Sequence, residues 1–150
     1  MNINPTPDEL IHNLIIGLET STTMSLRLIH MEPKLNENFG FKSWEYRFKV
    51  DESPVFLEVV YSVINSDKVF CQCIISKNEK TYFSFSDYMT FIKDSELSKL
   101  ETDNQVSFEP ANYVRGFLNL LKKQLVTGLN KVVTGEVWID VPFDWKKAGR

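Results

Sequence analysis

The amino-acid sequence predicts an α+β fold, in which an antiparallel meander sheet of about five or six strands carries an N-terminal helix and a long C-terminal helix packed on one face. Two observations support this prediction. Short segments of alternating apolar and polar residues follow one another between about residues 44 and 85, with turn residues between them. Segments with helical periodicity precede and follow this run, which is the element order of an α+β domain rather than of repeated βαβ units.

The length and composition are those of one folded domain. The chain has 150 residues, of which 43% are hydrophobic and 25% charged, so it can bury one core. Aromatic residues make up 13% of the chain, whereas glycine and proline number only six each. This balance argues against disorder and against a linker, and we expect a single α+β domain over residues 1–150.

The first helix has the clearest start signal in the chain. Thr6 can cap the helix, Pro7 occupies its first position, and Glu9 stands three residues after the cap. An apolar stripe follows at helical spacing and ends near Glu19, with Leu10, Ile11, Leu14, Ile15 and Leu18. His12 lies beside this stripe, so we expect a solvated side chain.

Five segments carry the alternation of half-buried strands. They are residues 24–28, 44–50, 55–63, 69–75 and 82–85, and the first of them could instead extend the helix. A polar loop is expected from residue 32 to 40. Asp51-Glu52-Ser53-Pro54 and Asn65-Ser66-Asp67 supply turn residues between consecutive strands, so the strands should pair as a meander.

The second half of the chain is predicted to be mainly helical. Ser86 and Asp87 resemble a cap for a short helix, and residues 94–110 read as polar loop or a frayed helical turn. Pro110 opens a helix of about five turns that is expected to end near Thr134 and Gly135, with its apolar face formed by Val114, Phe117, Leu118, Leu121, Leu125 and Leu129. Residues 137–141 alternate as a closing strand.

Charge, cysteine count and hydropathy exclude several classes of protein. The net charge is −3 and the pI is about 5.4, which gives no field for holding a nucleic acid. No apolar run is long enough to span a membrane, and the first ten residues do not resemble a signal peptide. Cys71 and Cys73 cannot form a disulfide framework. We therefore expect a cytoplasmic protein with no membrane or nucleic-acid partner.

No catalytic or cofactor signature is present. The six glycines are isolated, so no phosphate-binding loop can form. His12 and His30 have no metal-ligand neighbour at helical or strand spacing, and Cys71-x-Cys73 lacks the further ligands that zinc requires. We expect no cofactor, no metal site and no catalytic residue, and a protein that is not an enzyme.

Acidic residues are concentrated between Asp87 and Glu109, where only Lys93 and Lys99 offset them. Such a run is often a solvated face, but it can also steer an electropositive partner into contact. Aromatic side chains in the same region, Tyr88, Phe91 and Tyr113, are expected to be exposed anchors. The predicted partner-binding residues are Asp87, Tyr88, Asp94, Glu96, Glu101 and Asp103, together with Asp144 and Trp145 beyond the break at Pro142.

A small, acidic, aromatic-rich α+β chain without catalytic motifs resembles, in this whole-chain profile, the small bacterial immunity proteins. The resemblance implies a protein-binding inhibitor that neutralises a cognate toxin, such as a nuclease, by occluding its basic surface. Two alternatives remain open. One is a chaperone for a secreted effector, and the other is a small enzyme with a pocket built around His30, Glu32 and Tyr61.

Overall fold

The five strands of the sheet follow one another in the chain and in space. The computed structural model describes residues 7–21, 25–36, 41–64, 68–78, 81–106 and 109–136. Their strands are β1 (Leu26–Asn36), β2 (Phe41–Val50), β3 (Val55–Ile64), β4 (Lys68–Lys77) and β5 (Thr81–Ser84), all paired antiparallel in the order β1-β2-β3-β4-β5. The predicted meander is confirmed.

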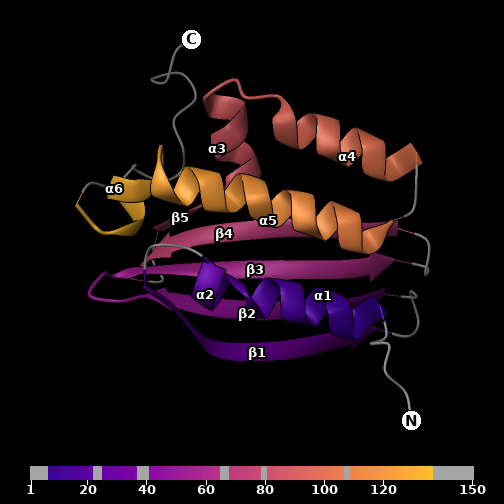
Figure 1. The fold of residues 1–150 in the computed structure, drawn as a ribbon. Helices are drawn as coiled ribbons and strands as arrows, with labels where there is room; N and C mark the ends of the chain where they lie inside the picture. Colours follow the sequence, from indigo (N-terminus) through magenta and orange to yellow (C-terminus); the bar gives the residue numbers. More distant parts are fainter. Residues whose placement is uncertain are drawn as a thin grey trace.

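The helices cover one face of this sheet. They are α1 (Pro7–Ile16), α2 (Leu18–Ser21), α3 (Phe85–Phe91), α4 (Glu96–Val106), α5 (Pro110–Val126) and α6 (Asn130–Val133). Figure 1 shows α1 and α5 side by side over the strands, with α3 and α4 beyond α5 towards the β5 side. The predicted α+β architecture, with the first helix and the long C-terminal helix on one face, is therefore confirmed. No helix among the described residues is long and apolar enough to cross a membrane.

The core lies between the sheet and these helices. Alternate residues of β2, β3 and β4 point into it, as the sequence pattern predicts. Residues with almost no exposure include Tyr46, Phe48, Leu57, Val59, Tyr61, Cys73 and Ile75 from the sheet, and Ile11, Ile15, Phe117, Leu121 and Leu125 from α1 and α5. Burial of these apolar surfaces is the main stabilising contribution to the fold.

The first strand is longer than predicted. β1 continues to Asn36, so the prediction of a loop from residue 32 was wrong for residues 32–36. Glu32, Pro33 and Lys34 pair with Glu45, Trp44 and Ser43 of β2. The ladder hydrogen bonds, with a partly exposed Lys34–Glu45 ion pair of 3.0 Å, override the weak strand propensity of this polar segment.

Residues 96–106 form a helix, although the sequence pattern predicts a loop or a frayed turn there. Asp94 Oδ1 accepts a hydrogen bond of 2.8 Å from the backbone N–H of Glu96, which caps α4. Leu97 is buried and Leu100 packs on the core. A Cβ placed on Gly116 of α5 would lie 2.8 Å from Leu100 Cδ1, so the glycine permits this close approach. Tertiary packing therefore stabilises a helix that has almost no apolar periodicity.

Two helix boundaries also differ from the prediction. Ser84, not Ser86, caps α3, since its Oγ accepts a hydrogen bond of 3.0 Å from the N–H of Asp87. The long helix ends at Val126, and α6 follows as a separate turn that keeps Leu129 and Val133 buried. The predicted closing strand at residues 137–141 lies outside the described residues.

A buried serine connects the β2–β3 turn to α6. Ser53 Oγ donates a 2.7 Å hydrogen bond to the carbonyl oxygen of Val133 and accepts one of 3.1 Å from the N–H of Val55. Ser53 is 5% exposed, so water cannot replace these bonds. The turn and the end of the helical layer are thereby held together.

We predict that Ser53→Ala lowers the free energy of unfolding by about 1–3 kcal/mol, because it leaves a buried N–H and a buried C=O without their partner. Urea unfolding would measure the change. Ser98→Ala on the exposed side of α4 is the control and should leave stability nearly unchanged. Equal stability of Ser53→Ala and the wild type would contradict the role given to this serine.

Candidate functional site

The predicted acidic block is divided by the fold into structural and exposed members. Asp94 caps α4 as described above. The Glu96 carboxylate lies 3.6 Å from Lys123 Nζ of α5, and this exposed ion pair joins the two helices. Both residues therefore have roles within the fold, although neither role prevents contact with a partner.

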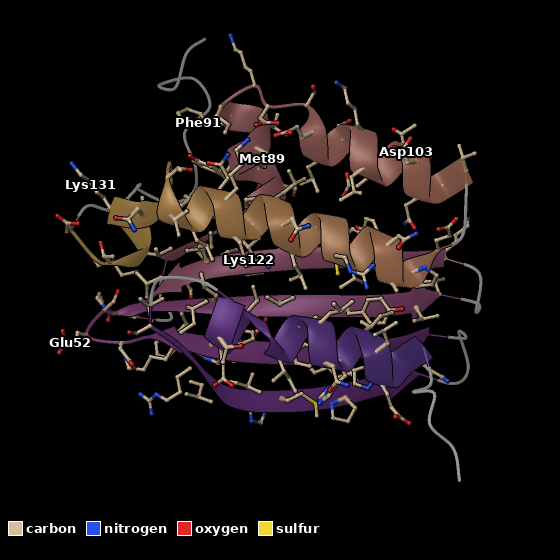
Figure 2. All side chains as sticks on the ribbon, in the orientation of Figure 1. Glu52, Met89, Phe91, Asp103, Lys122 and Lys131 are labelled. Carbon is tan, nitrogen blue, oxygen red and sulfur yellow. The ribbon has the colours of Figure 1, made fainter. Side chains whose placement is uncertain are left out.

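Three further acidic residues of the block lie on α3 and on the second half of α4, and Glu109 immediately precedes α5. Asp87 is exposed in the first turn of α3. Asp103 is exposed on the outer side of α4, and Figure 2 places it at the opposite end of the molecule from Glu52 in the β2–β3 turn. Glu101 is half-buried on the same helix. Asp144 and Trp145 lie outside the described residues.

The prediction of exposed aromatic anchors was wrong for Tyr88 and Tyr113. They are 6% and 3% exposed, because their rings fill the core beneath α3 and α5. The Tyr88 hydroxyl reaches the backbone at Gly128, where an added Cβ would lie only 2.2 Å from Oη. Phe91 is half-buried. Apolar contacts with a partner must therefore come from other residues.

Such apolar contacts are available beside the edge of β4. β5 pairs with β4 only over Ile74–Lys77, so the first half of β4 has no strand on this side among the described residues. Side chains from the helices bond there instead. The Tyr113 hydroxyl accepts a 3.0 Å hydrogen bond from the N–H of Cys71, and Asn104 Nδ2 donates one of 3.0 Å to the carbonyl oxygen of Val69.

A groove runs between the second half of α4 and this edge of β4. It has a volume of about 680 Å³, within the range of ligand pockets. Its lining consists of Ile64, Lys68, Val69 and Phe70 from the β3–β4 end of the sheet, Glu101, Asn104 and Gln105 from α4, and Tyr113 from α5. Phe70 is 43% and Ile64 36% exposed, so apolar surface lies open at this α4–β4 groove.

Two hydrogen-bond acceptors in the groove lack partners among the described residues. Asn104 Oδ1 is buried and has no hydrogen-bond partner, although most buried polar atoms are satisfied. Burial also raises the pKa of the Glu101 carboxyl, with no cation lowering it. Glu101 and Asn104 Oδ1 are therefore suited to accept hydrogen bonds from a cationic donor.

A smaller pocket adjoins the groove, between α4 and the start of α5. It has a volume of about 240 Å³ and shares Asn104 and Tyr113 with the groove, the rest of its lining being Leu100, Asp103, Glu109 and Asn112. Its two carboxylates, Asp103 and Glu109, add negative charge beside the groove. Glu101, Asp103 and Glu109 are thus the members of the predicted block that border pockets.

A third pocket of about 280 Å³ lies between α1 and the sheet. His12 lines it and its Nδ1 lies 3.2 Å from Tyr46 Oη, so the expectation of a solvated His12 was wrong. Glu9 and Asn13 line it as well, and their i, i+3, i+4 spacing with His12 is the sequence signal for this cluster. Tyr46 and Tyr61 are at most 2% exposed and belong mainly to the core.

The fold separates the residues of the enzyme alternative. His30 Nε2 lies 3.2 Å from Glu32 Oε1, and both side chains are exposed. His30 is paired with Arg47, next to Tyr46 in β2, so it points away from the face that buries Tyr46 and Tyr61. A pocket built around His30, Glu32 and Tyr61 is therefore contradicted.

The two cysteines are free thiols in the core, as the strand pattern predicts. Cys71 and Cys73 are 2% and 0% exposed, and burial raises the pKa of both thiols. They behave as small apolar side chains rather than nucleophiles. The described residues contain no group of three or more histidine, cysteine or acidic side chains that could hold a metal ion.

Comparisons of the chain with protein-family models, with curated proteins and with solved structures give no match. The sequence analysis missed two residues of the site, Asn104 and Phe70. An isolated asparagine in a polar segment and an outward-facing strand residue give no signal until the fold places them at one groove.

We predict that Glu101→Gln raises the melting temperature at neutral pH. The folded-state pKa of Glu101 is raised, so the ionised carboxylate costs stability above that pKa, and this cost disappears below the pKa of the unfolded chain. The advantage of the variant should therefore vanish near about pH 3.5. Thermal melts at both pH values would measure it. Asp103→Asn, at an exposed position, should show a smaller change, and an equal effect of both variants would contradict the burial argument.

Proposed function

We propose that the protein binds a basic protein partner through the outer surface of α4 and the α4–β4 groove. The observation that carries this proposal is the pair of acceptors, Glu101 and the Oδ1 of Asn104, that the described residues leave without a donor. The missing partner of the buried Asn104 Oδ1 costs free energy, and the Glu101 carboxylate is partly removed from water. A cationic donor from another protein would offset both costs.

The surroundings of the groove have the character of a protein interface. Two exposed apolar residues, Phe70 and Ile64, line the groove together with Glu101 and Lys68, and Val106 at the end of α4 is 85% exposed. Clustered exposed apolar residues rimmed by polar ones are typical of interaction sites. The exposed Asp87 and Asp103 would accelerate encounter with a positively charged surface.

Within this class we propose that the partner is a toxin domain and that binding neutralises it by covering its basic surface, for example the phosphate-binding groove of a nuclease. The support is the chemistry of the α4 surface, which offers carboxylates and hydrogen-bond acceptors to a basic surface. Inhibition by occlusion requires only a complementary surface. We place this activity in the cytoplasm, where the two cysteines would stay reduced.

We predict that Glu101→Lys together with Asp103→Lys abolishes capture of the partner. Affinity capture from native lysate, with mass spectrometry of the bound proteins, should recover a basic protein with the wild type and not with this double variant, because the reversed charges repel it. The recovered protein should lose its toxic activity when mixed with the wild-type chain in equimolar amount.

The control is Asp51→Lys together with Glu52→Lys, which changes the net charge equally at the distant β2–β3 turn (Figure 2). This control should still capture the partner, since it loses only the exposed Arg27–Asp51 ion pair. Equal capture by both double variants would reject the α4 surface as the binding site. A captured protein whose activity is unaffected would reject neutralisation.

A further inference from the structure

Glu101 and Asn104 are placed to act on one ligand group. They stand one helical turn apart, at i and i+3 on α4, so their side chains lie on the same face of the helix. Both line the α4–β4 groove. Asn104 is held in place because its Nδ2 bonds the carbonyl oxygen of Val69, which fixes the position of the unpartnered Oδ1.

The rest of the groove restricts what that group can be. Phe70 and Ile64 expose apolar surface at the groove, which suits an aliphatic or planar group rather than a hydrated ion. An anion would meet Lys68, but it would also meet the Glu101 carboxylate and the Asn104 carboxamide oxygen, both of which are acceptors. At Glu101 and Asn104 the groove therefore favours a group that donates hydrogen bonds and carries positive charge.

We propose that the α4–β4 groove receives an arginine side chain of the protein partner, with its guanidinium donating to Glu101 and to Asn104 Oδ1 and its stem lying against Phe70. This inference rests on the proposed function. A guanidinium presents several N–H donors in one plane and can bridge two acceptors, and that plane also stacks on an aromatic ring. A lysine ammonium is more strongly hydrated and offers no such plane.

The test uses the full ¹⁵N-labelled chain and the tripeptide acetyl-Gly-Arg-Gly-amide. Titration should give saturable shifts of the Asn104 side-chain NH₂ signals and of the Glu101 backbone N–H signal. The Asn104 signals are assigned by their loss in Asn104→Asp. The matching citrulline peptide, which is similar in shape but neutral, should produce no saturable shift, and the lysine peptide should bind at least several-fold more weakly.

Glu101→Gln should weaken binding of the arginine peptide by about tenfold, as expected for loss of one charge-assisted interaction. Asp87→Asn is the matched control, because it removes one carboxylate from α3 outside the groove, and it should leave the affinity unchanged. Because Glu101→Gln preserves the shape of the side chain, we expect this variant to keep the wild-type fold, and its affinity can be compared directly with that of the wild type.

Three results would overturn the inference: equal shifts with the citrulline peptide, equal affinity for the lysine peptide, or equal losses in Glu101→Gln and Asp87→Asn. These failures are distinguishable from failure of the proposed function. Suppose that the partner binds the wild type and Glu101→Gln equally well but does not bind the Glu101→Lys, Asp103→Lys variant. The proposed function would then stand, and the proposal that an arginine occupies the groove would be rejected.

Discussion

The first half of β4, which among the described residues has a strand on only one side, is the constraint on which the placement of α4 and α5 depends. Cys71 donates its N–H to Tyr113, so the backbone groups of Cys71 point away from β3, and those of Val69, two residues earlier, point the same way. Buried backbone groups require hydrogen-bond partners. Tyr113 and Asn104 supply them from α5 and α4, and β5 can therefore be short.

The use of side chains rather than a strand to bond this edge of β4 also creates the groove. A strand would have covered the β4 edge with a continuous ladder, whereas two side chains bond it at two points and leave space between the helix and the sheet. The Asn104 carboxamide also has more bonding capacity than this edge uses. Its Nδ2 bonds Val69, whereas its buried Oδ1 has no hydrogen-bond partner among the described residues. Unsatisfied groups of this kind are rare in folded proteins and often coincide with function.

The sequence predicted the parts of the fold that follow from local patterns. Alternation in residues 44–63 identified β2 and β3, and the apolar spacing after Pro110 identified α5. The pattern did not predict α4, because its stability comes from Leu97, Leu100 and the gap at Gly116 rather than from an apolar stripe. The predicted meander placed β4 correctly, but it could not show how far β5 would follow it.

The site was less predictable for the same reason. The bonds that define it join residues 35 and 42 positions apart, Asn104 with Val69 and Tyr113 with Cys71, and no local pattern encodes them. Charge clustering did bring Glu101 and Asp103 to attention, but it gave them the same weight as Asp94, whose carboxylate caps a helix. Only packing distinguishes a carboxylate that stabilises the fold from one that is available to a ligand.

The exposed and the half-buried carboxylates of α4 make different contributions to recognition. Salt screens Asp103 and Asp87 strongly because they are exposed, so their effect falls mainly on the rate of association. Glu101 is partly removed from water, so salt would screen its attraction to a bound cation less. Loss of that attraction would act mainly on the rate of dissociation. Binding of that cation must lower the raised pKa of Glu101, so by linkage protonation of the carboxyl opposes binding. High salt would then slow assembly of the complex, whereas acidification would shorten its lifetime.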